Sequence, residues 1–350
     1  MANNEQRRVK RMGARGVVAG ILTPIGAIGV LAILIMGVGA GSATPVYGPA
    51  APPTVLTTLP TIDAVAANTS TVFYQNVNNC QDVYAMAPFG SPGIYSVLPV
   101  PQGTCTEGSL AIALTYNSCG CASDVLYDVV GGTLFQITDW GTVVTPLASF
   151  PVPFGVREDM GLTWDQTGNF SHDLIITSSS DGQIWTYNIT TGITTLFMKL
   201  GMYIAGPAVA PYGFGSVGGD LLVAEKHANQ VVAITPLGVV STVTSWTEST
   251  GVAFDAAPQG YGFGPNAYTL FVANFTSGAL MAWTNSQLVT YNSAYNSQGW
   301  LMSGNNHGIA SFDGTGATSL YASNTLRLSA ITFVSYTPSC CTGNGCGSQP

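Results

Sequence analysis

Residues 161–187 read GLTWDQTGNFSHDLIITSSSDGQIWTY, and this stretch decides the fold. Three short runs of apolar and β-branched residues begin at Gly161, Leu174 and Gly182, and turn-forming residues separate them. Such runs are typical of β-strands joined by tight turns. A Gly-containing turn at Gly192 and one more run follow, so the stretch predicts an antiparallel unit of four strands.

The unit repeats along the chain, and this repeat is the strongest signal in the sequence. The strand that opens at Leu174 has counterparts that lie at successive spacings of 48, 47, 49 and 50 residues, at Leu126, Leu221, Leu270 and Leu320. One more counterpart, Val72, lies 54 residues ahead of Leu126. The glycine that opens the motif recurs at Gly206, Gly251 and Gly308. Four short strands in about 48 residues is the period of a β-propeller blade.

Six units predict an all-β fold, a six-bladed β-propeller over residues 54–338. The sixth unit lacks an outermost strand after Val334, and we expect Thr54–Thr58, ahead of the first unit, to supply it. Such a strand closes the ring, whereas an open ring leaves unpaired sheet edges. A pair of β-sandwiches is the alternative, but a sandwich has no reason to repeat a four-strand unit at nearly constant spacing.

Charge is scarce in this chain. Asp, Glu, Lys and Arg make up 7% of the residues, against roughly 25% in an ordinary soluble domain. The 46% of hydrophobic residues excludes a disordered chain, and the lack of charged faces argues against a helical bundle. Residues 16–350 hold 4 basic and 16 acidic residues, a net charge of −12, so nucleic acid is not expected as a partner.

The N-terminus carries the signal of a membrane anchor. Residues 16–40 form an apolar run long enough to cross a bilayer, and the basic residues of segment 1–15 precede it. The sequence therefore predicts one transmembrane helix with a cytoplasmic N-terminus and an extracellular body. A cleaved signal peptide is one alternative, and an archaeal prepilin processing site at Arg15-Gly16 is another.

The segments on either side of the propeller have their own compositions. Residues 41–53 are rich in Pro, Gly and Ser and predict a stiff spacer, and residues 339–350 form a Cys/Gly-rich tail. Small-residue patterns inside the apolar run let membrane helices approach closely. Self-association into a homo-oligomer therefore stands beside a single anchored copy as an alternative.

Cysteine and glycosylation signals also indicate export. The seven cysteines have no zinc-type spacing and are disulfide candidates in an oxidising compartment: Cys80, Cys105, Cys119, Cys121, Cys340, Cys341 and Cys346. Because seven is odd, one thiol is free or intermolecular. Four Asn-x-Ser/Thr triplets make glycosylation candidates of Asn68, Asn169, Asn188 and Asn274.

The candidate ligand site is one mouth of the central channel. In a propeller, the loops into the innermost strands and the turns after the second strands open at one face. The polar residues at these points are Arg157, Glu158, Asp159, Glu225, His227, Glu248, Asn274, His307, Asn324 and Arg327. One interpretation is a polar funnel for a ligand or a cation. The other is that loops simply hold whatever charge a β protein has, and no catalytic residue is assigned.

Aromatic residues in the Gly/Asn-rich insertions allow two interpretations. Tyr212 and Trp300 are examples. Such side chains offer contact area at little entropic cost, so they suit a sugar or a protein partner. They are equally suited to filling hydrophobic gaps between blades.

The glycine-led strand starts, together with second strands that end in polar residues, resemble a known superfamily. It comprises the six-bladed propellers of NHL-repeat proteins, SMP-30/gluconolactonase enzymes and strictosidine-synthase-like enzymes, and the resemblance covers roughly residues 60–337. It implies the architecture. In the metal-dependent lactonases an Asn directly before the innermost-strand Gly typically ligates the cation, whereas this chain has Met160, Ala205, Thr250 and His307 there. No metal site and no cofactor are therefore predicted.

The sequence thus predicts a membrane-anchored extracytoplasmic β-propeller that acts as a binding, recognition or structural surface protein. The setting is a cell envelope or the surface of a virion, and the expected partner, besides the membrane, is a surface protein or a glycan. Sparse charge is compatible with an acidic habitat, where carboxylates are neutral. The alternative function is a divergent lactonase or hydrolase that uses a divalent cation in the channel.

Overall fold

The computed structural model describes residues 51–76, 78–87, 91–100, 107–116, 122–151, 159–254, 268–291, 299–303, 308–316, 318–322 and 327–335. Over these ranges the chain forms 24 strands, the helix α1 (Asn285–Tyr291) and two single-turn 3-10 helices, which confirms the all-β prediction. No helix of these ranges is long and apolar enough to cross a membrane, and the predicted membrane segment 16–40 lies outside them.

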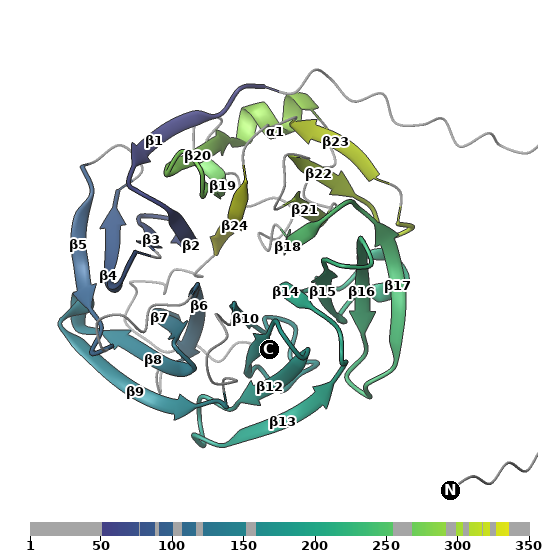
Figure 1. The fold of residues 1–350 in the computed structure, drawn as a ribbon, viewed down its shortest axis with the longest axis horizontal. Helices are drawn as coiled ribbons and strands as arrows, with labels where there is room; N and C mark the ends of the chain where they lie inside the picture. Colours follow the sequence, from purple (N-terminus) through teal and green to yellow (C-terminus); the bar gives the residue numbers. More distant parts are fainter. Residues whose placement is uncertain are drawn as a thin grey trace, which may run out of the picture. The chain divides into compact units, whose positions relative to one another are not determined.

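The strands form groups of four antiparallel neighbours that are arranged in a ring, which is the arrangement of a β-propeller (Figure 1). Four groups follow the chain from the innermost strand outward. The first two are β2 (Ile62–Asn68), β3 (Val72–Asn76), β4 (Asn79–Met86) and β5 (Gly93–Val97), then β6 (Ser109–Tyr116), β7 (Ala122–Val130), β8 (Thr133–Thr138) and β9 (Val143–Ser149). The next two are β10 (Met160–Trp164), β11 (Leu174–Ser178), β12 (Gln183–Tyr187) and β13 (Thr194–Lys199), then β14 (Ile204–Val209), β15 (Leu221–Glu225), β16 (Gln230–Ile234) and β17 (Val240–Ser245).

The remaining eight described strands form two groups whose segments alternate along the chain. One group has the order β18 (Ser249–Phe254), β21 (Gly299–Ser303), β22 (Ile309–Phe312) and β23 (Thr318–Ala322). The other has the order β24 (Leu328–Ser335), β19 (Tyr268–Asn274), β20 (Ala279–Thr284) and β1 (Thr54–Thr58). A short parallel pairing of β24 with β2, with Ala67 opposite Val334, joins this group to the β2 group in one eight-stranded sheet. The chain therefore leaves β18 for the next group and returns to pair β21 with β18.

This alternation corrects the predicted order of the last two repeat units. The strand after Gly308 was predicted to be innermost and the Leu320 strand second, but β22 is third and β23 outermost in the group of β18. The Leu270 strand is second, as predicted, but beside β24 instead of β18. Spacing along the chain identifies strands, but it contains no information on which neighbour a strand pairs with, so the regular period concealed the exchange.

The predicted closing strand is confirmed. β1 pairs antiparallel with β20, with Thr54 opposite Ala282 and Thr58 opposite Ala279. The backbone N–H of Leu59 donates to the carbonyl of Gly278 at 2.8 Å, just beyond this pairing. An N-terminal strand thus completes a group whose innermost strand comes from the end of the described chain, and the ring is closed by strand pairing.

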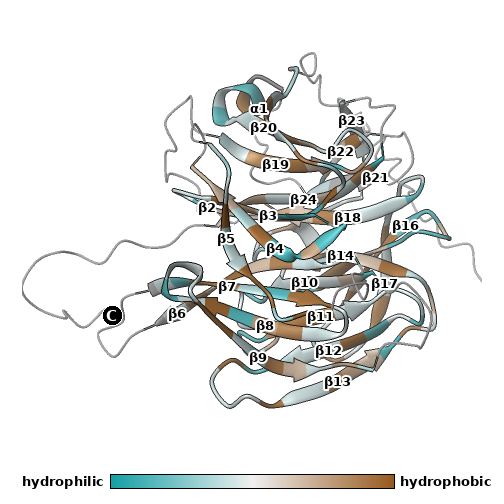
Figure 2. Ribbon diagram, turned by 60° about the vertical axis from the view of Figure 1, so that its left-hand side comes forward, coloured by the Kyte–Doolittle hydropathy of each residue, from teal (hydrophilic) through white to brown (hydrophobic). Residues whose placement is uncertain are grey.

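The core lies between neighbouring groups. Ala111 of β6 and Leu162 of β10 belong to one buried cluster, and Trp185 of β12 packs against Phe150, with ring centroids 5.3 Å apart. Figure 2 shows apolar residues along the strands of successive groups. Each group is therefore held chiefly by burial of its two faces against its neighbours, because apolar area removed from water is the dominant stabilising term.

Candidate functional site

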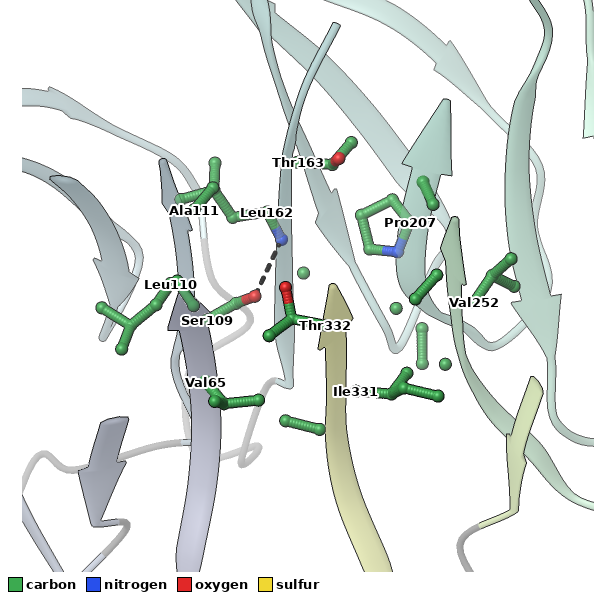
Figure 3. A pocket seen from close by; sticks show the side chains of 18 of the residues that line it. Val65, Ser109, Leu110, Ala111, Leu162, Thr163, Pro207, Val252, Ile331 and Thr332 are labelled. Atoms are coloured by element: carbon green, nitrogen blue, oxygen red, sulfur yellow. Dashed lines mark hydrogen bonds between the residues drawn. The ribbon is translucent and has the colours of Figure 1, made fainter. Parts of the chain in front are cut away.

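The innermost strands β2, β6, β10, β14, β18 and β24 surround a cavity of about 390 Å³. Figure 3 shows side chains from these strands around one space, including Val65, Ser109 and Pro207. The walls are tied together between groups, since the backbone N–H of Leu162 donates to Ser109 Oγ at 3.1 Å. A cavity of this size is within the range of small-molecule sites, which begins at about 300 Å³.

Polar residues gather where the innermost strands begin. Five charged residues line the cavity, together with the phenol of Tyr203, and all belong to this end: Asp63, Glu107, Asp159, Lys226 and Arg327. The other cavity-lining residues are neutral. We call the six residues the polar mouth. They come from five different strand groups, so the propeller architecture, and not local sequence, brings them together.

An ion pair crosses the polar mouth. Arg327, directly before β24, places Nη2 3.2 Å from Oε1 of Glu107, which lies just before β6. The guanidinium carbon of Arg327 lies 4.5 Å from the ring centroid of Phe275, a distance suited to cation–π attraction. The carboxylate and the ring together fix the direction of the guanidinium.

A second set of contacts links Asp159 to its neighbours. The hydroxyl of Tyr203 donates a short hydrogen bond to Asp159 Oδ2, and Lys226 Nζ lies 5.8 Å from the centroid of the Tyr203 ring. The backbone N–H of Asp159 donates to Ser179 Oγ at 3.1 Å, and this ties the Asp159 backbone to the turn after β11. Burial and the neighbouring Asp159 raise the pKa of the Tyr203 hydroxyl, so the phenol stays a donor at all physiological pH values.

Glu107 is the titratable centre of the polar mouth. Burial, followed by the charge of Asp159, raises the pKa of Glu107 to about 7, although the neighbouring Arg327 and Lys226 act in the opposite direction. A hydrogen bond between the Glu107 and Asp159 carboxyl groups adds to the increase in pKa. The Glu107 carboxyl group is therefore partly protonated near neutral pH, because burial and an adjacent negative charge both disfavour its ionised form.

Two further carboxyl groups lie behind Glu107. Asp63 of β2 is 4% exposed and Asp128 of β7 is fully buried. Burial raises the pKa of both groups well above the ordinary value. Asp63 Oδ2 accepts from the backbone N–H of Gly108 at 3.3 Å, and Asp128 Oδ2 accepts from Gln75 Nε2 at 2.9 Å. Over the described residues, Oδ1 of Asp63 is buried and has no hydrogen-bond partner, and it belongs to a residue that lines the cavity.

The opposite end of the cavity has a different chemistry. Trp164, Thr167, Tyr212 and Phe254 line it where the innermost strands end. Tyr212 is 66% exposed and donates its hydroxyl to Asn169 Oδ1 at 2.8 Å. This end can contact apolar or hydrogen-bonding groups, but it offers no ionic partner among the described lining residues.

The structure brings two of the ten predicted ligand-binding residues to the cavity, Asp159 and Arg327. Two others, Glu225 and Glu248, serve turns or lie elsewhere. Glu225 is 3% exposed and accepts hydrogen bonds from the backbone N–H groups of His227 and Ala228. Glu248, at a positive φ of 50°, donates its backbone N–H to Asn229 Oδ1 and does not line the cavity.

The other predicted candidates divide into two sets. Asn274 is 1% exposed and its Oδ1 accepts from the backbone N–H groups of Thr276 and Ser277, so it shapes the turn after β19. His227 lies beside the polar mouth, with its ring centroid 5.0 Å from that of Tyr203. The candidates outside the described residues are Arg157, Glu158, His307 and Asn324.

Asp63, Glu107 and Tyr203 were not predicted as site residues. A signal for two of them was present, because Asp63-Ala-Val-Ala and Glu107-Gly-Ser-Leu-Ala-Ile each place an acid directly ahead of an apolar run. Neither segment has the glycine-led motif in the form that it takes from Gly161 onward, so neither was predicted to be an innermost strand. Tyr203 had no such signal, because its role depends on Asp159 of the neighbouring group.

Two candidate aromatic residues have opposite positions. Trp300 is fully buried in β21, with its ring centroid 4.9 Å from that of Tyr321. Tyr212 stands exposed at the cavity. Filling a gap between groups is therefore the role of Trp300, whereas Tyr212 lies exposed at the end of the cavity opposite the polar mouth.

Metal, cysteine and glycosylation signals are only partly covered by the described ranges. Within those ranges no three His, Cys, Asp or Glu residues are placed to hold a metal ion. Cys80 is fully buried and disulfide-bonded. The other six candidate cysteines lie outside the described residues. The amide nitrogens of three candidate glycosylation sites donate to the protein itself, namely Asn68 to Asp124, Asn169 to Gly219 and Asn188 to Asp173.

No protein-family model and no curated protein match this sequence. Solved structures similar to it include virginiamycin B lyase from Staphylococcus aureus, at 14% identity over 76% of this chain and 72% of that chain, with a TM-score of 0.43. A chain of a nidogen/laminin complex shows 10% identity over 80% and 86%, with a TM-score of 0.49. TolB from Acinetobacter baumannii shows 14% identity over 78% and 57%, with a TM-score of 0.42. At these identities and TM-scores the neighbours carry no argument about activity.

Proposed function

We propose that this chain is a membrane-anchored extracytoplasmic binding protein. In this proposal residues 54–338 form a six-bladed β-propeller, residues 16–40 anchor it, and the polar mouth of the channel is its ligand site. The propeller faces the outside of a cell or a virion and binds its ligand without transforming it.

One observation carries the binding role. Six polar side chains from five strand groups meet at one end of a cavity of about 390 Å³ whose other lining residues are neutral. Placing charged groups in a partly buried position costs free energy unless they find partners. The acids and bases of this chain are few, and a concentration of them at a cavity is the pattern of a ligand site.

The export part of the proposal has separate support. Cys80 is disulfide-bonded, and stable disulfides are typical of oxidising compartments. The apolar run 16–40 follows a basic segment and has the length of a membrane span. Both features agree with a body that lies outside the cytoplasm.

A thermal-shift screen tests the ligand site. Full-length protein is heated with a panel of small acids, amines, sugars and neutral aromatic compounds, because a ligand that binds the folded state raises Tm. At least one class is expected to raise Tm in the wild type, and the Tyr203→Phe variant is expected to lose that increase. The matched variant Tyr212→Phe removes a hydroxyl from the opposite end and should keep it. A panel that leaves Tm unchanged, or equal losses in both variants, would contradict a ligand site at the polar mouth.

The anchor is tested by mass spectrometry on intact membranes. A peptide from residues 1–15 in the membrane fraction supports an uncleaved anchor, and protease added to the outside should digest the body but spare that peptide. A mature chain that starts near residue 41 would instead show a cleaved signal peptide.

The lactonase alternative is tested by calorimetry with Ca²⁺, Mn²⁺ and Zn²⁺. Saturable cation binding that disappears in Asp159→Asn and Glu107→Gln would favour the enzyme over the binding protein. Heat changes without saturation, or saturable binding that both variants retain, would leave the polar mouth without a role in cation binding.

A further inference from the structure

Basic residues are scarcer than acids in this chain, and their positions are informative. Between residues 16 and 350 the only basic residues are Arg157, Lys199, Lys226 and Arg327. Of the three that the structure describes, Lys226 and Arg327 line the cavity. Lys199 lies on the outer strand β13, where it pairs with Asp181 at 2.8 Å. A body with a large excess of acids thus places two of its few cations at one mouth.

Arg327 is positioned as a binding group. The ring centroid of Phe275 lies 4.5 Å from the guanidinium carbon of Arg327. This contact leaves the N–H groups at the edge of the guanidinium for hydrogen-bond acceptors. Its ion-pair partner in the described part of the chain is Glu107, whose side chain is 25% exposed. A planar guanidinium suits a carboxylate because it can donate two parallel hydrogen bonds.

The proton on Glu107 controls whether Arg327 is free for another anion. The ionised carboxylate neutralises the guanidinium, whereas the protonated carboxyl group leaves an unpaired positive charge. The groups that face Glu107 come from every neighbouring element: Asp63 of β2, Asp159 before β10, Lys226 after β15 and Arg327 before β24. Behind these groups, Asp128 faces Asp63, Tyr203 donates to Asp159, and His227 lies against the Tyr203 ring.

Asp63 provides a second, independent indication of a ligand. Its side chain lines the cavity and is more than nine-tenths buried, yet Oδ1 has no hydrogen-bond partner among the described residues. A buried polar atom without a partner is costly, and a ligand is one way to satisfy it. A protonated carboxyl group at this place can donate a hydrogen bond to an oxygen of the ligand.

We propose that the polar mouth binds a small organic carboxylate when Glu107 is protonated, so that an ionised Glu107 takes up a proton as the ligand binds. The ligand's carboxylate replaces Glu107 as the partner of Arg327 and lies near Lys226, while its neutral part enters the channel. No covalent bond forms or breaks; the proton passes from solvent to Glu107, and the ligand stays ionised. The inference rests on the proposed ligand site and adds the chemical class of the ligand and its dependence on pH.

The charge balance favours an anion over a cation. With Asp63 and Glu107 protonated, the charges that remain are those of Asp159, Lys226 and Arg327, a net charge of +1. The raised pKa values of Asp63 and Glu107 make this state accessible in mildly acidic solution. An ammonium ligand at the same place would approach both cations and meet a single carboxylate.

Calorimetry with benzoate on the full-length protein in detergent micelles tests the proposal, with benzylamine and benzyl alcohol as the cationic and neutral counterparts. Micelles without protein provide the blank. Ordinary carboxylates have pKa values near 4, so benzoate stays ionised above pH 6. With a Glu107 pKa of about 7, the affinity for benzoate is expected to fall about tenfold between pH 6 and pH 8.

Three variants identify the groups involved. Glu107→Gln mimics the protonated carboxyl group, so it should bind benzoate at pH 8 about as tightly as the wild type does at pH 6. Arg327→Gln should lose at least about tenfold in affinity at pH 6, because a charge-assisted contact disappears; Arg327→Lys, which keeps the charge, should retain part of the affinity. Lys199→Gln, with the same change in net charge on an outer strand, should bind as the wild type does.

The possible outcomes separate this inference from the proposed function. Benzoate binding that is independent of pH, or that Arg327→Gln leaves intact, overturns the inference. Binding of benzylamine in preference to benzoate also overturns it, but leaves the polar mouth as a ligand site. Absence of benzoate binding also overturns the inference. If, in addition, no compound of the thermal-shift panel binds, the proposed function fails together with the inference.

Discussion

Arg327 and Glu107 are 220 residues apart in the sequence, and their side chains meet at 3.2 Å across the mouth of the channel. Glu107 precedes β6 and Arg327 precedes β24, and both of these strands adjoin β2 in the ring. The pair therefore joins an early and a late part of the chain across the group that starts with β2. It can form only when the ring is complete, so the ligand site and the closed fold depend on each other.

The pH dependence of stability follows from the buried carboxyl groups. Burial raises the pKa values of Asp63, Glu107 and Asp128 in the folded protein. Each group therefore binds its proton more tightly in the folded than in the unfolded state, and the free energy of unfolding falls as pH rises from about 4.5 through the folded pKa values. For Glu107, with a folded pKa of about 7, the loss is on the order of 3 kcal/mol.

We expect Tm to be higher at pH 5 than at pH 8, as measured by circular dichroism. The Asp128→Asn variant should show a smaller difference, because its side chain can still accept from Gln75 but no longer titrates. A Tm that is constant or that rises between pH 5 and pH 8 would contradict the raised pKa values. The direction agrees with the expectation of an acidic habitat.

The closing strand makes Gly278 sensitive to substitution. Its φ is +64°, and an added Cβ would lie 1.7 Å from the carbonyl oxygen of Leu59. Gly278→Ala should therefore separate the chain after β1 from β20 and lower the free energy of unfolding by about 3 kcal/mol or more. Gly238→Ala is the matched control: its φ is +79°, nothing lies within 4 Å of the added Cβ, and the cost should be about 1 kcal/mol. Equal costs in urea denaturation would show that the closing contact is absent.

The sequence predicted the architecture because a repeated strand pattern is a local property. The Leu174 and Leu221 strands are second in their groups as expected, and Thr54–Thr58 closes the ring. Asp165, directly after the glycine-led strand, shapes the following turn, since its carboxylate accepts from the backbone N–H groups of Thr167, Gly168 and Phe170. Each of these features depends on neighbours within a few residues or on the constant period.

The errors concern relations between distant residues. Nothing local distinguishes Ile309–Phe312 as a third strand from an innermost one, because both are short apolar runs after a glycine. Glu225 and Asp159 both lie at strand ends on the side of the polar mouth. The Glu225 carboxylate accepts from the backbone of its own turn, whereas the Asp159 carboxylate accepts from Tyr203 of the next group. Which of these happens depends on the neighbouring blade, and the sequence around each acid does not contain that information.

Trp300 tests the exchanged strand order. It is fully buried in β21, and its ring also lies 6.0 Å from that of Phe333 in β24. Trp300→Ala should therefore cost about 3–5 kcal/mol in the free energy of unfolding, as measured by chemical denaturation. Trp140→Ala is the control, because Trp140 is 90% exposed and its loss should cost about 0.5 kcal/mol or less. A small cost at Trp300 would indicate that this residue lies in a surface loop. It would then contradict the exchanged order and favour a sequential strand order in the last two groups.

Asp159 controls the titration of its neighbour across the strand groups. Its negative charge and its hydrogen bond raise the pKa of Glu107, after burial, which has the largest effect. Asp159→Asn removes the charge and keeps the shape, so the pKa of Glu107 should fall by about one unit or more, the size expected for an adjacent charge. The measurement is carbon-13 NMR of the Glu107 carboxyl group, assigned by comparison with Glu107→Gln. Asp181→Asn removes an equal charge beside Lys199 on the outer strand and should leave the Glu107 titration in place. A midpoint that is the same in the wild type and in Asp159→Asn would show that the two carboxyl groups do not interact, and Glu107 would then owe its raised pKa to burial alone.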